Sequence, residues 1–182
     1  MRFGYAELFE TAVKGIRNQN ELAQESSEIA DFWSMLQGFQ TSGKCIEKAH
    51  YRIRYMKSFR PLSVKEDIEF KEARPILYLN TAAVASLFNS RNAGSTSNRS
   101  NWSTIMSYLK SHASYLGLKQ DRFTILLPSG LPDYTIDIVN GEQVKKVKVN
   151  RPKALCFDYL QLKETFGLDL ETEIIDCINN ME

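Results

Sequence analysis

The sequence has few of the residues that build metal sites, disulfide frameworks or catalytic dyads. Its 182 residues include two histidines, His50 and His112, and three cysteines, Cys45, Cys156 and Cys177. An odd number of cysteines without a CxxC pair argues against a disulfide framework and favours reduced, partly buried thiols in a cytoplasmic protein. Neither histidine has a cysteine or a carboxylate at metal-ligand spacing. We therefore expect no metal, no cofactor and no catalytic centre, and an enzyme is the least favoured interpretation.

Long apolar runs are also lacking. No stretch approaches the roughly 20 apolar residues that a membrane span needs. The first ten residues, MRFGYAELFE, carry acids where a signal peptide would be apolar. The chain is therefore expected to be cytoplasmic, with no membrane partner, and it is long enough to bury a substantial core.

The charges nearly cancel in total but are segregated along the chain. The formal net charge is +1, so the chain as a whole is not a polycation. Residues 44–60 and 145–153 are basic, whereas residues 164–182 are acidic. Any nucleic-acid binding must therefore depend on where the cations lie rather than on their sum.

Gly38, Gly43 and Lys44 have the spacing of a phosphate-binding P-loop, with Cys45 where a serine or threonine would bind magnesium. That mechanism needs a strand before the loop and a helix after it. Here the patterns predict the reverse order. We interpret the segment as the last turn of a helix and do not propose ATP binding.

The N-terminal part, residues 1–79, predicts two helices followed by a β-hairpin. Apolar residues recur at helical spacing in two stretches separated by the polar run at residues 18–21. From His50 the period changes to two, which is typical of half-buried strands that pair and pack on the helices. The expected helices cover residues 3–19 and 26–41, and the expected strands cover residues 51–56, 68–70 and 76–79.

Residues 80–158 predict a winged-helix-like unit. Its focal element is an amphipathic helix that begins near Asn101, carries an apolar stripe from Trp102 to Leu116 and ends at Gly117. Asn140-Gly141 between two alternating runs predicts a β-hairpin with a type I′ turn, which would enlarge the wing. The other expected elements are a helix from residue 81, a loop at 94–100, and strands at 123–127, 134–139, 144–149 and 155–159.

Residues 159–182 predict a C-terminal helical segment, with helices at 160–166 and 170–178 separated by Gly167. The expected fold class is therefore α+β, with an N-terminal helical pair plus β-hairpin, a winged-helix-like unit and a C-terminal helix. The three segments can equally form one compact domain.

Two sets of polar residues are candidate nucleic-acid contacts. The first lies in and just before the focal helix, where short hydroxyl side chains surround one cation and can approach phosphates closely. The second is the basic strand of the hairpin and the run after it, because a wing can bring cations to a phosphate backbone. The candidates are Arg99, Asn101, Ser103, Thr104, Ser107, Lys110, Lys146, Lys148, Arg151 and Lys153.

Each set has a purely structural alternative. Lysines on exposed strands also prevent edge-to-edge aggregation. Inside the focal helix no Arg, Asn or Gln offers bidentate readout of bases, so binding there would be weakly sequence-specific. For Arg52 and Arg54, which alternate on the first hairpin strand, a solvated face is the favoured interpretation.

Pairing across Asn140-Gly141 places Thr135, Asp137, Lys146 and Lys148 on one face of the hairpin, and Tyr134, Ile136, Ile138, Val147 and Val149 on the other.

Four segments carry a resemblance to a known family: IADFWSMLQGFQTSGKCIEKAHYRI, RPILYLNTAAVASLF, MSYLKSHASYLG and ALCFDYLQLKETFGLDL. They resemble the C-terminal region of primase/helicase-type proteins of bacterial mobile elements and phages, in which this region follows a P-loop ATPase core. The resemblance implies a winged-helix-like appendage that engages DNA or a partner such as the ATPase/helicase or primase. The chain lacks ATPase and primase motifs, so it does not imply those activities here.

The sequence therefore predicts a non-catalytic DNA-binding module in the replication of a mobile element or phage, with RNA as the alternative nucleic acid. The competing hypothesis is a protein–protein interaction or homo-oligomerisation module. In that case the acidic C-terminal helix would dock on a basic surface such as residues 44–60 of another copy.

Overall fold

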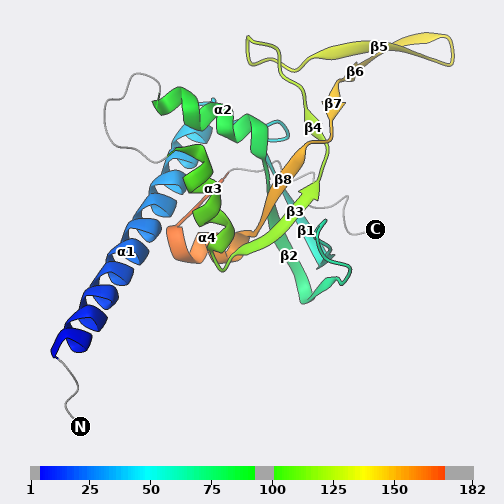
Figure 1. The fold of residues 1–182 in the computed structure, drawn as a ribbon. Helices are drawn as coiled ribbons and strands as arrows, with labels where there is room; N and C mark the ends of the chain where they lie inside the picture. Colours follow the sequence, from blue (N-terminus) through cyan, green and yellow to red (C-terminus); the bar gives the residue numbers. More distant parts are fainter. Residues whose placement is uncertain (1–4, 93–100, 171–182) are drawn as a thin grey trace.

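The computed structural model describes residues 5–92 and 101–170, and its mixture of helices and antiparallel sheets confirms the α+β class. The helices in this part of the chain are α1 (Tyr5–Thr41), α2 (Thr81–Asn92), α3 (Trp102–Ser111) and α4 (Tyr159–Phe166). The strands are β1 (Tyr51–Phe59), β2 (Ile68–Asn80), β3 (Tyr115–Gln120), β4 (Phe123–Thr124), β5 (Tyr134–Val139), β6 (Glu142–Val147), β7 (Val149–Asn150) and β8 (Lys153–Asp158). Figure 1 shows their arrangement.

α1 is one continuous helix of 37 residues, so the expected N-terminal helical pair is wrong. The polar run at residues 18–21 contains neither proline nor glycine, and its glutamine and glutamate are good helix formers. The first half of α1 projects from the body (Figure 1) and therefore needs no apolar stripe there. Two of the apolar side chains described in this half, Ile16 and Leu22, are 58% and 65% exposed. At 1.5 Å per residue the helix is about 55 Å long.

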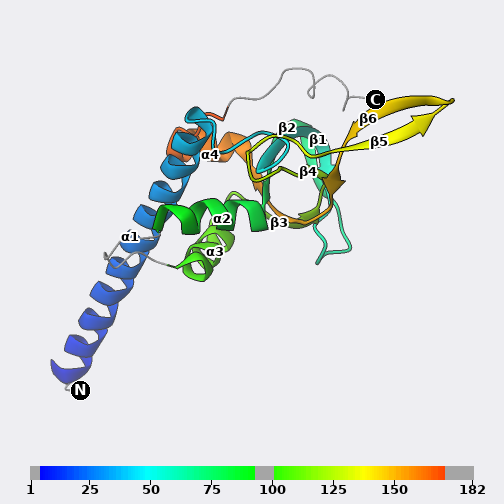
Figure 2. The same cartoon turned by 90° about the horizontal axis from the view of Figure 1, so that it is seen from above.

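The central sheet has four antiparallel strands in the order β1-β2-β8-β3. β1 and β2 form the expected hairpin, with Tyr51 opposite Leu79. β8 comes from much later in the chain and lies between β2 and β3, so one sheet joins residues from the expected N-terminal and winged-helix-like segments. Seen from above, the strands curve along part of a ring (Figure 2).

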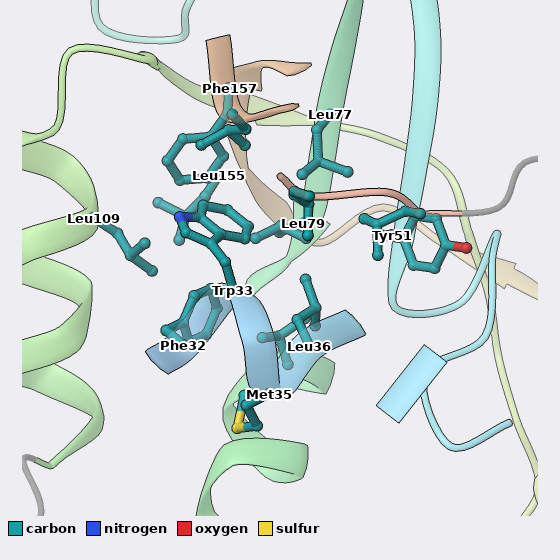
Figure 3. Close-up of a cluster of buried hydrophobic side chains, with 14 of the residues drawn as sticks. Phe32, Trp33, Met35, Leu36, Tyr51, Leu77, Leu79, Leu109, Leu155 and Phe157 are labelled. Atoms are coloured by element: carbon teal, nitrogen blue, oxygen red, sulfur yellow. The ribbon is translucent and has the colours of Figure 1, made fainter. Parts of the chain in front are cut away.

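The main core lies between the C-terminal half of α1 and one face of this sheet (Figure 3). Trp33 is 1% exposed, and its ring centroid lies 5.0 Å from that of Phe32 and 5.2 Å from that of Phe157. Alternate strand residues and two residues from each of the later helices complete the cluster, including Tyr51, Ile53, Leu77, Leu79, Phe88, Leu109, Leu155 and Leu162. A second, smaller cluster occupies the opposite face of the sheet and contains Phe59, Ile76, Tyr78, Phe123, Ala154 and Cys156.

Capping side chains fix where three helices begin, and α2 starts at Thr81, as the sequence predicted. Asn80 Oδ1 accepts a backbone N–H of the first turn of α2 at 3.4 Å. Asn101 Oδ1 accepts the N–H of Thr104 in α3 at 3.0 Å. Asp158 caps α4, and Gly167 ends it in the left-handed conformation, which confirms the helix expected at 160–166. The helix expected at 170–178 lies almost entirely outside the described residues.

α3 ends at Ser111, so the expected continuation of the focal helix to Gly117 is wrong. Residues 115–120 form β3 instead. The backbone oxygen of Ser114 accepts the N–H of Asp158 at 2.8 Å, which draws the chain onto β8, and Leu118 then lies opposite Leu155. Sheet pairing therefore overrides a helical apolar pattern that continued through these residues.

At Gly117, β3 passes close to the loop after β1. Its φ is +129°, and a Cβ atom there would lie 2.7 Å from Pro61 Cβ. The loop cannot easily retreat, because the N–H of Leu62 donates to the backbone oxygen of Leu118 at 2.8 Å. This position therefore requires glycine on both conformational and steric grounds.

Gly117→Ala is expected to lower the free energy of unfolding by about 1–3 kcal/mol. Gly15→Ala is the matched control, since Gly15 lies in α1 with no atom near its would-be Cβ. That substitution is expected to raise stability by about 0.5–1 kcal/mol. Urea unfolding followed by circular dichroism measures both, and equal effects of the two substitutions would contradict the close approach at Gly117.

The glycine-containing turn at residues 38–45 is the C-terminus of α1, as interpreted from the sequence. Gly43 has φ +72°, and the N–H of Cys45 donates to a carbonyl of the last helical turn at 2.9 Å. Cys45 and Cys156 are buried thiols, and burial raises the pKa of Cys45 to about 12, so no reactive thiolate forms there. Cys177 lies outside the described residues.

β5 and β6 form the expected hairpin, with φ of +54° at Asn140 and +83° at Gly141. Thr135 lies opposite Lys146 and Tyr134 opposite Val147, so the expected division into two faces is confirmed for the residues of the two strands; Lys148 and Val149 lie beyond the paired residues. The hairpin projects from the body (Figures 1 and 2). Every residue of both strands is exposed. The strand expected at 123–127 is shorter than predicted and comprises only β4.

Candidate nucleic-acid interface

Six cationic side chains from separate parts of the chain gather on the sheet face opposite α1. They line two adjacent depressions, and we call them the basic cluster. Its members are Lys48, Arg52, Arg54, Lys119, Arg122 and Arg151. Asp121 is the one carboxylate among the lining residues of these two depressions, so the surface carries a strong local excess of positive charge.

The alternation of β1 places two of these cations on one side. Ile53 points into the main core, so its neighbours Arg52 and Arg54 point to the opposite face of the sheet. Arg52 Nη1 donates to the backbone oxygen of Arg122 at 2.9 Å. Arg54 Nη2 lies 2.8 Å from Asp121 Oδ1, which is 8% exposed. These two contacts attach the link between β3 and β4 to β1 and thereby bring Arg122 to the cluster.

The two depressions are open and of similar size. One has a volume of about 390 Å³ and is lined by Arg54, Lys119, Arg122 and Arg151 together with Leu62, Gln120 and Asp121. The other has a volume of about 310 Å³ and is lined by Lys48, Arg52, Arg122, Thr124 and Val149. Arg122 borders both, so anions bound in the two depressions would share this guanidinium group. Such an arrangement suits a chain of phosphates better than a single small anion.

Two cations of the cluster lie over aromatic rings and make cation–π contacts with them. The guanidinium of Arg54 lies 5.8 Å from the ring centroid of Tyr78, and Lys119 Nζ lies 5.1 Å from that of Phe59. Both rings are buried, at 2% and 1% exposure, and burial raises the pKa of the Tyr78 hydroxyl above its usual range. Because these rings are covered, they cannot stack on bases. The cluster is therefore suited to phosphates rather than to nucleobases.

Lys48 is held in an uncommon backbone conformation at the edge of the cluster. Its φ is +66°, a region that favours glycine and asparagine over lysine. Its backbone oxygen accepts the N–H of Thr124 at 2.8 Å, and its own N–H donates to the oxygen of Tyr51. A lysine in this conformation costs of order 1 kcal/mol, which is consistent with a use for the cationic side chain at this position.

Two lysines at the β5–β6 hairpin, in contrast, are paired with acids, whereas Lys145 Nζ lies 4.1 Å from the ring centroid of Tyr134. Lys146 Nζ lies 2.6 Å from Asp137 Oδ2, and Lys148 Nζ lies 2.8 Å from Asp133 Oδ2. The hydrogen bond from Lys146 lowers the pKa of Asp137, which keeps that carboxylate ionised. Residues 133–149 contain three acids and three lysines and thus have no net charge. Contact of this hairpin with phosphates stays a prediction, and these pairs weaken its basis.

The candidate residues of α3 lie apart from the basic cluster. Asn101 Oδ1 accepts hydrogen bonds from the hydroxyls of Ser103 and Thr104, so these three side chains form the helix cap. Ser107 and Lys110 are exposed on the helix. The helix packs on the face of the sheet that also carries α1, whereas the cluster lies on the other face. The structure therefore does not bring α3 and the basic residues onto one surface.

The remaining candidates follow β7. Arg151 belongs to the basic cluster, and Lys153 lies directly opposite Gln120, which lines the same depression. Arg99 lies outside the described residues. The sequence patterns did not identify Lys48, Lys119 or Arg122 as candidates, and they favoured a solvated face for the β1 arginines. The signal in the sequence that pointed to this region was the basic segment 44–60 with its alternating arginines. The residues that join these arginines in the cluster are brought to them only by the tertiary structure.

The described residues offer no group of three or more His, Cys, Asp or Glu side chains that could hold a metal ion. Within the same part of the chain, no helix combines the length and the apolar character that crossing a membrane requires. Comparison of the chain with protein-family models, with curated proteins and with solved structures found no match.

Proposed function

We propose that this protein is a non-catalytic nucleic-acid-binding module that holds a phosphate backbone on the basic cluster. The observation that carries the proposal is the convergence of cations from β1, the β3–β4 link and the segment after β7 on two depressions that share Arg122. Lys and Arg side chains on one surface displace the counterions of a nucleic acid, and this release supplies most of the affinity of sequence-independent binding.

The chemistry of the cluster favours backbone binding over base recognition. Its nearest aromatic rings are buried, and the cap of α3 engages Asn101, the side chain best suited to read a base on that helix. We therefore propose weak sequence dependence. DNA is the proposed ligand, and RNA with the same phosphate spacing is the alternative that direct comparison distinguishes.

The order and pairing of the strands and helices support a winged-helix fold for this module. A winged helix has the chain order strand, two helices, and two further strands, with the first strand paired to the last. β2, α2, α3, β3 and β8 have this order, and β2 pairs with β8. We propose a winged-helix unit whose wing is extended by the segments from β4 to β7. A role as the appendage of a primase/helicase-type protein from a mobile element or phage belongs to the same proposal.

Fluorescence anisotropy with a labelled short duplex tests the proposal directly. At about 50 mM salt we expect saturable binding that weakens steeply as salt is added. Single-stranded DNA and an RNA duplex of equal length, titrated in parallel, identify the preferred ligand. Absence of binding to all three at low salt would overturn the proposal and favour the interaction-module alternative.

A further inference from the structure

The β5–β6 hairpin presents two free strand edges. Among the described strands, none pairs with the outer edge of β5 or of β6. All twelve residues of the two strands are exposed, and Figures 1 and 2 show the hairpin extending away from the body. A two-stranded sheet is at best marginally stable in water, and a free edge is a template for another strand. The hairpin is therefore suited to accept a further strand.

The turn determines which backbone groups each strand offers. In a two-residue hairpin the residues that flank the turn, Val139 and Glu142, exchange both backbone hydrogen bonds. Because this pattern alternates along the strand, Glu142, Val144 and Lys146 direct their backbone groups toward β5. The intervening residues Gln143, Lys145 and Val147 direct theirs outward, to the free edge of β6.

The sequence of β6 complements itself when two copies run antiparallel. A two-fold axis at Val144 places Glu142 of each copy opposite Lys146 of the other, with the two Val144 side chains between these ion pairs. In the same register Gln143 lies opposite Lys145, and these are the residues whose backbone groups point outward. The register that pairs these charges therefore also pairs the outward-facing backbone groups.

The outer edge of β5 lacks this property. Its only charged residue is Asp137, which already pairs with Lys146 at 2.6 Å, so two β5 strands would bring no cation to either carboxylate. At a β6 edge, Lys146 would instead lie between Asp137 of its own hairpin and Glu142 of the second copy. The hairpin has no net charge, so two copies do not repel each other overall.

We propose that a second copy of this chain docks along the edge of β6 and forms a four-stranded antiparallel sheet in the order β5-β6-β6-β5. The interface is isologous, as in most homodimers, and it adds strands through backbone hydrogen bonds. On the other face of the new sheet, Gln143 of each copy meets Lys145 of the other, and Ile136 and Ile138 lie beside them on the β5 strands. This docking is independent of the basic cluster.

Sedimentation velocity over a range of protein concentrations tests the proposal with charge reversals. Glu142→Lys and Lys146→Glu each replace two attractive pairs by two repulsive ones, so each variant alone is expected to dimerise about tenfold more weakly or worse. An equimolar mixture of the two variants restores both attractions. We expect heterodimers in the mixture, and their absence would overturn the proposed register.

Lys145→Pro provides a second test that does not depend on charge. Its N–H faces the free edge, so proline removes an intermolecular donor and leaves the β5–β6 hydrogen bonds in place. We expect this variant to be monomeric. A wild-type chain that stays monomeric at all concentrations, or a Lys145→Pro variant that dimerises like the wild type, would overturn the proposal. Because the basic cluster is unchanged in all these variants, their binding of a short duplex separates this outcome from failure of the proposed function.

Discussion

Replacing both Arg122 and Arg151 by glutamine is expected to weaken binding of a short DNA duplex by about 10- to 100-fold at low salt. Both side chains are exposed, and each lines a depression of the basic cluster. The substitutions therefore remove the proposed phosphate contacts while the buried core stays intact. Fluorescence anisotropy measures the affinity, and circular dichroism verifies that the fold is unchanged.

The matched control is Lys146→Gln with Lys148→Gln in the projecting hairpin. It lowers the total charge by the same two units, but each of these lysines already pairs with an aspartate. On a duplex short enough to occupy one copy, we expect a change of about threefold or less. If the hairpin variant lost as much affinity as the cluster variant, binding would depend on total charge or on the hairpin, and the proposed site would be wrong.

Trp33→Ala is expected to lower the free energy of unfolding by about 3–5 kcal/mol. Trp33 is 1% exposed, and its ring contacts aromatic rings from three elements, those of Phe32, Phe157 and Phe166. Alanine would leave a cavity between α1 and the central sheet at the position shown in Figure 3. For a domain of this size such a loss is a large part of the total stability, and urea unfolding followed by circular dichroism measures it.

Leu22→Ala serves as the control in the same helix. Leu22 is 65% exposed on the projecting half of α1, and alanine is at least as good a helix former. We expect a change within about 0.5 kcal/mol. If Trp33→Ala cost no more than Leu22→Ala, the packing of α1 on the sheet could not be the main core of the protein.

Features that depend on local chemistry could be predicted from the sequence. The Asn140-Gly141 turn, the start of α2 at Thr81 and the alternation of Ile53 with its arginine neighbours each reflect a preference of a few adjacent residues. The two faces of the β5–β6 hairpin followed from that turn alone. The Asp137–Lys146 pair was implied by the same register, since both residues were assigned to one face.

Features that depend on distant partners could not be predicted in this way. α3 ends at Ser111 because β8, more than forty residues later, pairs with the chain that follows. α1 continues through a polar run because that half of the helix lies outside the core, where no apolar pattern is needed. The basic cluster joins residues from Lys48 to Arg151, and only the curved sheet brings them together.

The salt dependence of DNA binding tests the central claim most directly. The observed binding constant is measured for a short duplex between about 50 and 200 mM salt, for the wild type and for the variant with Arg122→Gln and Arg151→Gln. With about four phosphates held by the cluster, the slope of log K against log salt is expected near −4, and about two units shallower in the variant. A wild-type slope near zero, or the same steep slope in both proteins, would contradict a phosphate-binding role for the basic cluster.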